Sequence, residues 1–434
     1  MGKMEHYHRA LQFYRDRGEW HDATLWQIRK KRDRAVAEVE NWEELRERAS
    51  QIKEKVLKEW DRWIALFTER ARQNGIEVYF AETAEEHNRL VYLLLEGIGA
   101  KKVVKSKSML TEECGLNRYL EERGIEVIDT DLGERIVQLR GEPPSHIVLP
   151  AVHLKKEEVA EALGEKSSDP LHLTREMRRR LRREFLSADA AITGANFLVA
   201  EKGWGVVCTN EGNADLGVTL TPLHIISVGI EKIVPTLEGL APFLKMLARN
   251  ATGQPITTYT TFFGSPAPGH RRAIILVDNG RRKRGKGEFW ETLKCIRCSA
   301  CLTTCPVFRR SGGHSYRYTI PGPIGSLLAP LVDRKGYRDL PFACTLCGSC
   351  EAVCPVKIPF SRLLVQMRGY VTTPTLLAVW AEKGLHLPTA WKLFSLILKL
   401  TPPSLLELAV REWSRYRKLP LPTGKGGNRN RERG

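Results

Sequence analysis

Apolar residues recur at helical spacing over the first 75 residues of the chain. Between Arg29 and Asn74 they fall three or four positions apart, and Gly75 then provides a helix stop. The repeating positions are Val36, Val39, Trp42, Leu45, Ala49, Ile52, Val56, Trp60, Trp63, Phe67 and Ala71. This pattern predicts one long amphipathic helix, or two, within a helical N-terminal extension over residues 1–75. We interpret its three tryptophans as core anchors rather than as a binding face.

The pattern changes after Gly75 to short β-rich runs that alternate with helical stretches. Strands are predicted at Glu77–Phe80, Lys102–Lys105, Glu126–Asp129, His146–Leu149, Ala190–Thr193, Phe197–Ala200, Val206–Thr209, Ile225–Val228 and Ala273–Val277. Helices are predicted at Ala84–Glu96, Thr111–Glu122 and Leu171–Phe185. Such alternation is typical of a mostly parallel sheet covered by helices, so we expect an α/β domain over residues 76–280. Ligands of such sheets bind at the carboxyl ends of the strands.

A basic, glycine-punctuated segment at residues 281–287 is interpreted as a linker that marks a domain boundary. We expect a second domain over residues 281–384, a helical C-terminal region over 385–423 and a disordered basic tail over 424–434. Within the C-terminal region, Leu385–Leu400 mixes apolar residues with lysines and is too short and too charged to span a bilayer. Two interpretations stay open: a helix packed on the second domain or on a partner subunit, and an amphipathic helix on an anionic membrane surface.

Composition and charge narrow the function classes only in part. The chain has 434 residues, and its 68 Lys and Arg against 51 Asp and Glu leave a net charge of +17. Such a charge fits nucleic acid, an anionic membrane, an acidic protein or an anionic substrate. The arginine-rich stretch at Leu171–Phe185 lacks interleaved aromatic residues, which favours a solvated face or an acidic partner. The chain has no apolar run of membrane-spanning length and no apolar signal core at Met1–His8, which predicts a cytoplasmic protein.

Eight of the ten cysteines lie within residues 295–354, in two copies of the motif C-x2-C-x2-C-x3-C-P. In this motif three thiolates can bind three irons of one cubane, while the fourth cysteine binds the other cluster. We therefore predict two [4Fe-4S] clusters. The expected ligands are Cys295, Cys298, Cys301 and Cys354 for one cluster, and Cys344, Cys347, Cys350 and Cys305 for the other.

Zinc is the competing metal, but structural zinc sites usually pair two C-x2-C knuckles and need neither a third cysteine nor a C-P ending. The 38 residues between Cys305 and Cys344 exceed those of a minimal bacterial ferredoxin. This spacing suggests a mainly α-helical two-cluster module of the kind found in subunits of respiratory oxidoreductases. Two neighbouring cubanes favour the passage of single electrons over a purely structural role.

Two stretches of the first domain resemble the LUD (lactate utilisation) domain. They are ITGANFLVAEKGWGVVCTNEGNAD at Ile192–Asp215 and TPLHIISVGIEKIVP at Thr221–Pro235, with KSKSM at Lys105–Met109 as a further match. Together with the double cysteine motif, they make the chain similar to the LutB-type lactate utilisation iron-sulfur proteins. The resemblance implies a sugar-isomerase and CoA-transferase-like α/β fold, and a role beside two partner subunits in oxidising L-lactate to pyruvate. One departure is Lys202, where the family usually has Thr.

Polar residues near the predicted strand ends indicate a site for a small anion. The candidates for substrate binding are Lys107, Ser108, Glu201, Glu211 and Asn213. Residues of these types also commonly cap turns, so a structural role stays open. The chain shows no Gly-x-Gly-x-x-Gly fingerprint of a flavin or nicotinamide site, and no catalytic residue is assigned.

The sequence therefore predicts an iron-sulfur electron-transfer subunit of a complex that oxidises L-lactate, a 2-hydroxy acid, to pyruvate, rather than a complete enzyme. Electrons would pass through both clusters to a downstream acceptor, and the C-terminal region would allow a peripheral contact with the inner face of the membrane. The alternative is a scaffold or sensor subunit that binds an anionic metabolite and whose clusters are structural. A nucleic-acid partner is not expected, since no helicase, glycosylase or base-stacking motif accompanies the positive charge.

Overall fold

Four helices and a π-helical turn form the N-terminal extension, where one or two helices were predicted. They are α1 (Glu5–Phe13), the turn Tyr14–Gly18, α2 (Glu19–Ala37), α3 (Trp42–Lys58) and α4 (Trp60–Gln73). The breaks occur where the backbone of Asn41 and Glu59 leaves the helical region, with ψ of 31° and 33°. Trp60 and Trp63 are buried, as expected of core anchors, and Trp42 is partly buried. The computed structural model describes residues 5–372, so the predictions for 385–423, Leu385–Leu400 and 424–434 lie outside the described residues.

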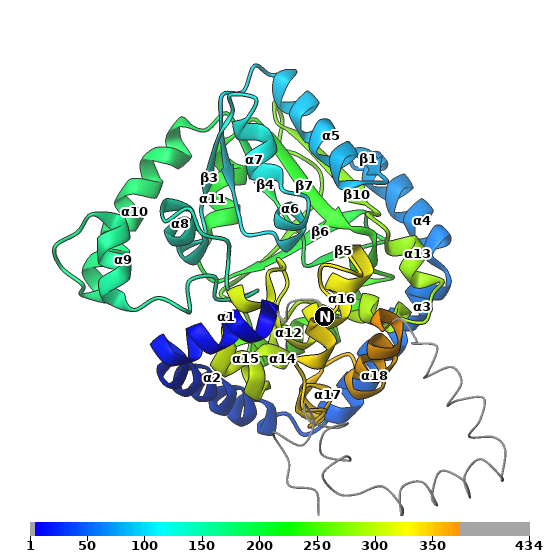
Figure 1. Cartoon of the computed structure of the whole chain (residues 1–434). Helices are drawn as coiled ribbons and strands as arrows, with labels where there is room; N and C mark the ends of the chain where they lie inside the picture. Colours follow the sequence, from blue (N-terminus) through cyan, green and yellow to red (C-terminus); the bar gives the residue numbers. More distant parts are fainter. Residues whose placement is uncertain (1–4, 373–434) are drawn as a thin grey trace, which may run out of the picture. The chain divides into compact units, whose positions relative to one another are not determined.

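The main sheet has six strands, and every neighbouring pair is parallel (Figure 1). Its order is β1 (Glu77–Ala81), β10 (Arg271–Val277), β7 (Leu223–Gly229), β4 (Ala190–Thr193), β2 (Lys102–Lys105) and β3 (Glu126–Asp129). The register places Ile226 of β7 beside Thr193 on one side and beside Ile274 on the other. Because all six strands run the same way, their carboxyl ends meet at one edge of the sheet.

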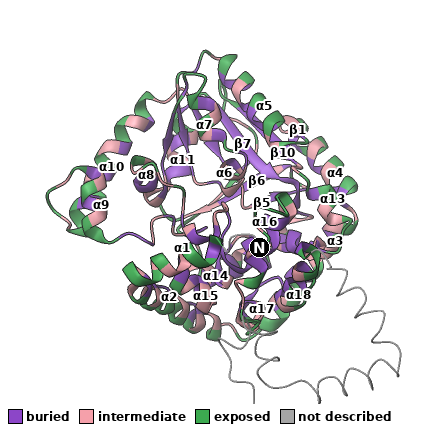
Figure 2. Cartoon of the chain, viewed as in Figure 1, coloured by how far each residue is buried: buried purple, intermediate pink, exposed green. Residues whose placement is uncertain are grey.

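Helices cover both faces of this sheet, as the predicted α/β domain requires (Figures 1 and 2). The apolar core on one face joins α5 (Ala84–Glu96) and α7 (Leu116–Glu121) to the strands. The cores on the other face join the strands to α4, α10 (Pro170–Ser187) and α11 (Asn213–Leu220). Adjacent residues of β10 show the alternation, since Ile275 belongs to the first core and Ile274 to the second.

A second, four-stranded sheet packs against the core that contains Ile274. Its order is β8 (Ile233–Val234), β5 (Phe197–Val199), β6 (Trp204–Thr209) and β9 (Tyr259–Phe263). Only β5 and β8 are parallel, so this sheet is mixed. The sequence reading missed both edge strands, β8 because it has two residues and β9 because only Phe263 of its five residues is buried.

Two predicted elements are wrong. Residues His146–Leu149 form a bent loop instead of a strand, because His146 Nδ1 accepts hydrogen bonds from the backbone of Val148 and Leu149. The helix predicted over Thr111–Glu122 is divided into α6 (Met109–Glu113) and α7, because Gly115 has a φ of 65°. The remaining helices of this part are α8 (Leu132–Leu139), α9 (Lys156–Leu163) and α12 (Leu237–Thr252).

The segment after residue 280 is mainly α-helical, as predicted, and has no strand between residues 281 and 372. It contains α13 (Arg281–Gly285), α14 (Ala300–Thr304), α15 (Pro306–Ser311), α16 (Gly322–Val332), α17 (Ser349–Val353), α18 (Phe360–Val371) and the 3-10 turns Trp290–Lys294, His314–Tyr316 and Leu340–Phe342. Helix α2 packs against α14 and α15, so the N-terminal extension supports this segment. The expected linker at 281–287 starts instead with a packed helix, since Arg281 is buried.

Candidate functional site

The two cysteine motifs form two separate pockets, each with three cysteines of one motif and the last cysteine of the other. The first pocket is lined by Cys295, Cys298, Cys301 and Cys354. The second pocket is lined by Cys305, Cys344, Cys347 and Cys350. This is the combination that the crossed motif calls for in two cubane clusters.

The backbone of both motifs bends in the same way around these pockets. Arg297 and Ser299 have φ of 61° and 64°, and the equivalent positions Leu346 and Gly348 have φ of 55° and 73°. Three of these four are not glycine, so the left-handed conformation is imposed by the fold rather than by residue preference. Repetition of the bend at matching positions fits two loops that each wrap one cluster.

Backbone amides and buried thiols complete the fit to iron-sulfur clusters. The N–H groups of Arg297, Leu346 and Ile358 donate to the sulfurs of Cys295, Cys344 and Cys354 at 3.4, 3.3 and 3.4 Å. Burial raises the pKa of the Cys298 thiol to about 12 and that of Cys354 to about 11. Such thiols ionise only beside a strongly bound cation, and amide-to-sulfur hydrogen bonds are a known means of tuning clusters.

The two pockets are neighbours but differ in their access to solvent. Cys301 of the first pocket and Cys350 of the second interact electrostatically, and α14 packs on α17. Cys347 of the second pocket is exposed, whereas Cys298 and Cys354 of the first are buried. Phe342, in the 3-10 turn two residues before Cys344, is exposed as well.

A larger cavity of about 310 Å³ lies where the carboxyl ends of the main strands meet the first cysteine loop. Its walls include Ser106–Ser108 after β2, Gly194–Asn196 after β4, Gly229 at the end of β7 with Glu231 after it, and Ile296–Cys298 of the first motif. Cys298 and Arg297 line both this cavity and the first cysteine pocket. The cavity is therefore separated from the first cluster pocket only by a wall that the two share.

Most charged groups of the cavity wall are paired. Lys107 Nζ lies 2.7 Å from Asp131 Oδ2, and Arg281 bridges Glu231 and Glu113 at 2.6 and 3.0 Å. These ion pairs hold the wall in place. Their cations already have carboxylate partners and are not available to bind an anion.

Two cations of the wall have no hydrogen-bonded carboxylate among the described residues, although the Glu231 carboxylate attracts both. Arg297 Nη1 is buried and has no hydrogen-bond partner in the described part of the chain. Lys232 makes no hydrogen bond or ion pair with any residue between 5 and 372, and burial lowers its pKa to about 8. Glu211 is the remaining acid, and burial, with the nearby Asp131 carboxylate, raises its pKa to about 7. A small carboxylate is the ligand class that this combination suits best.

The structure brings together four of the five residues predicted to bind substrate. Lys107, Ser108, Glu211 and Asn213 all line the cavity. Asn213 is already engaged, since its side chain bonds Thr209 and Thr130 at 3.0 and 3.2 Å. Glu201 is not part of the wall, because its carboxylate accepts a hydrogen bond from Leu237 N at the start of α12.

Sequence reasoning missed these two cations of the cavity wall. Lys232 lies in the stretch quoted for the family resemblance, and Arg297 lies between two motif cysteines. For Arg297, the available signal was a basic residue inside a cluster motif. The spacing of the cysteines predicts neither the burial of Arg297 nor its position beside strand ends of the α/β domain.

Two family models match adjoining parts of the chain between residues 64 and 358. The LUD domain model matches residues 64–289, and the 4Fe-4S dicluster domain model matches residues 291–358. The dicluster match and the two cysteine pockets agree that the chain holds two [4Fe-4S] clusters.

Several curated proteins are similar over most of their length. Lactate utilization protein B of Macrococcus caseolyticus is 44% identical, with 82% of this chain and 77% of that protein covered. The same-named protein of Geobacillus thermodenitrificans is 41% identical, with 92% and 90% covered. The Escherichia coli protein described as uncharacterized electron transport protein YkgF is 43% identical, with 82% and 75% covered.

A solved structure, that of a DUF162 family protein from Deinococcus radiodurans, aligns with 50% of this chain and 97% of its own at 16% identity and a TM-score of 0.29.

Within residues 5–372, no helix combines the length and the apolar character that crossing a membrane requires.

Proposed function

This chain belongs to the LUD domain family and, within it, to the lactate utilization protein B group, and on that premise we propose that it is the electron-transfer subunit of a complex that oxidises L-lactate to pyruvate. The observation that carries the proposal is the shared wall between the cavity and the first cysteine pocket. When bound, the two clusters accept and release single electrons.

The ligand sets follow the two pockets. We assign Cys295, Cys298, Cys301 and Cys354 to the first cluster, and Cys305, Cys344, Cys347 and Cys350 to the second. The chain positions these sets side by side through α14 and α17, so electrons need to cross only a short distance between them.

The difference in exposure gives the transfer a direction. The first set borders the buried cavity, and the second reaches the surface at Cys347. Electrons therefore enter beside the cavity and leave through the second cluster to an acceptor that docks near Phe342 and Leu346, which are 52% and 38% exposed. We expect this acceptor to be a partner subunit or a component at the inner face of the membrane, with the protein in the cytoplasm.

The cavity binds the carboxylate of a 2-hydroxy or 2-oxo acid. Lys232 and Arg297 supply the positive charge, while the Lys107–Asp131 pair holds another part of the wall in place. The substrate-oxidising centre of the complex takes two electrons from a hydroxy acid and passes its two protons to solvent, and two one-electron clusters together match the electron count.

Spectroscopy on the intact complex tests this function. The complex is purified without oxygen through a tag on this chain, and L-lactate is added while the clusters are followed by electron paramagnetic resonance. We expect L-lactate to reduce the clusters and D-lactate, as a matched control, to do so less. If the complex converts L-lactate to pyruvate while the clusters stay oxidised, the clusters are structural and the scaffold or sensor function replaces electron transfer.

A further inference from the structure

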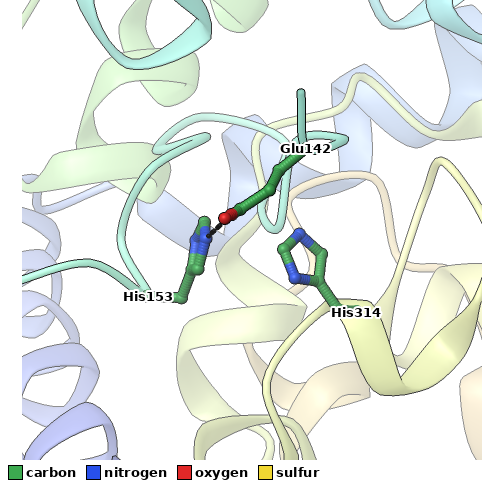
Figure 3. Close-up of side chains that lie close together, drawn as sticks. All are labelled: Glu142, His153 and His314. Carbon is green, nitrogen blue, oxygen red and sulfur yellow. Dashed lines mark hydrogen bonds and ion pairs between the residues drawn. The ribbon is translucent and has the colours of Figure 1, made fainter. Parts of the chain in front are cut away.

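Three side chains with metal-binding atoms meet outside the cysteine pockets and the cavity (Figure 3). Glu142 and His153 lie in the loop between α8 and α9, and His314 lies in the 3-10 turn that follows the first cysteine motif. One ligand atom of each residue lies within 4.8 Å of the other two. None of the three lines a cysteine pocket or the cavity, so the proposed electron path does not use them.

The ring of His153 is fixed with Nε2 directed at Glu142. Its Nδ1 lies 2.7 Å from Ser145 Oγ, and that hydroxyl donates to the Pro150 carbonyl oxygen at 2.9 Å. In this arrangement Nδ1 carries the hydrogen, and Nε2 presents its lone pair to Glu142 Oε2 at 2.9 Å. Two acceptors at this distance share one cation, either a proton or a metal ion.

The ring of His314 is oriented by a second backbone contact. Its Nε2 lies 2.8 Å from the Pro143 carbonyl oxygen, which can only accept, so Nε2 is the donor. This leaves Nδ1 as the ring atom with a lone pair. The ring packs edge-on against His153, with centroids 4.6 Å apart. A ligating histidine whose other nitrogen is held by a carbonyl or hydroxyl oxygen is the usual outer-shell arrangement of metal sites.

The carboxylate of Glu142 is held in the same way. Its Oε1 pairs with Arg140 Nε at 2.7 Å, which leaves Oε2 for the histidine pair. The positive charge of Arg140 repels a cation bound to Glu142 and therefore lowers the affinity of the site for that cation. The orientation of Oε2 is nevertheless fixed before a metal arrives.

We propose that Glu142, His153 and His314 form a binding site for a divalent transition-metal ion, with Zn²⁺ or Fe²⁺ as the matching chemistry. Two imidazoles and one carboxylate suit both ions and leave a further coordination position open. Tetrahedral ligands around zinc are roughly 3.3 Å apart. The site therefore forms when His314 moves toward the other two residues and the 2.9 Å contact between Glu142 and His153 opens slightly.

Such an ion would tie the α/β domain to the cluster segment. The loop from Glu142 to His153 also supplies Ile147, Val148 and Leu149 to the cavity wall. His314 follows Gly313, which packs against the backbone of Ser145 in this loop. The ion therefore cross-links the two domains at their junction. Its effect on stability is separate from electron transfer.

Metal binding to the cluster-loaded full chain tests the site. Protein with about eight irons per chain is prepared without oxygen and titrated with Zn²⁺ against a chromophoric chelator, and in a parallel arm with Fe²⁺. We expect one additional ion per chain, at least tenfold weaker binding in H314Q and E142Q, and a zinc-dependent rise in melting temperature that both variants lose. The matched control is H172Q, which removes an exposed histidine paired with Glu165 at 2.9 Å and should bind as wild type.

X-ray absorption at the zinc edge decides the case even if a variant loses its clusters. Nitrogen and oxygen ligands in the wild-type protein support the site. Sulfur ligands would show zinc at the cluster cysteines and overturn the proposal, as would unchanged binding in H314Q and E142Q. Loss of this ion with intact reduction by L-lactate separates the site from the proposed electron transfer.

Discussion

The guanidinium of Arg281 and the carboxylate of Glu231 form a buried ion pair beside the cavity, with Nε 2.6 Å from Oε2. Arg281 also bonds Glu113, and the three residues join the start of the cluster segment to the α/β domain. The side chains of Arg281 and Glu231 are only 2% and 4% exposed, so neither charge has water as an alternative partner.

The variant R281Q should strongly destabilise the protein. It leaves Glu231 and Glu113 buried without their cation, and breaking a buried pair in this way typically costs about 3–5 kcal/mol. Urea unfolding of the cluster-loaded chain measures the loss. The control is R118Q, which removes an exposed pair with Glu122 and should leave unfolding unchanged. Equal effects of the two variants would contradict the structural role of Arg281.

The variant K232Q should weaken binding of L-lactate and pyruvate. Lys232 lines the cavity without a partner among the described residues, and a charged hydrogen bond is worth about 1.5–3 kcal/mol, or roughly 10- to 100-fold in affinity. Calorimetry on the cluster-loaded chain measures it. Lys245 is exposed on α12, so K245Q is the matched control. If K232Q binds both acids as tightly as K245Q, the cavity holds its ligand by other groups.

Binding of the same acids should strengthen as the pH falls through about 7. Burial, with the Asp131 carboxylate, raises the pKa of Glu211 to about 7, so lower pH removes a negative charge from the cavity wall. In E211Q the wall is neutral at this position at every pH, and affinity between pH 6 and 8 should change less than in wild type. E201Q, outside the cavity, should keep the wild-type profile. A pH profile that E211Q does not flatten would count against this assignment.

The variant C354S should damage the first cluster and leave the second. Cys354 lies in the second motif but lines the pocket of Cys295, Cys298 and Cys301. Iron analysis and electron paramagnetic resonance should show about half the iron and one remaining signal. C208S, which alters a cysteine outside both motifs, should retain both clusters. Selective loss of the second cluster would show that the ligands are not crossed.

The variant G313A should disturb the junction between the two domains. A Cβ at Gly313 would lie 1.7 Å from the Ser145 carbonyl oxygen, so the loop must shift. We expect a loss of more than about 2 kcal/mol, as for other overpacked positions. Thermal unfolding measures it, with G287A as control because a Cβ there meets only ordinary contacts at 3.6 and 3.7 Å. Similar melting temperatures for the two variants would mean that the junction is loosely packed.

Local patterns predicted most of the sheet. The predicted bounds agree with the structure at both ends of three strands, Lys102–Lys105, Glu126–Asp129 and Ala190–Thr193. Short apolar runs between turns allow few other strand positions. His146–Leu149 was misplaced because its apolar residues serve a loop that a histidine side chain closes. The spacing of apolar residues does not reveal that side-chain contact.

The sequence by itself determined the cluster chemistry, since thiolate spacing and the following proline dictate how a cubane can be wrapped. It also determined the α/β character of the first domain, because strand and helix periods are local properties. Only the tertiary structure decided that Arg297 and Lys232 share one cavity, that Glu201 lies outside it, and that His314 meets Glu142 and His153. These relationships join residues more than sixty positions apart, and packing between domains, which no local pattern encodes, brings them together.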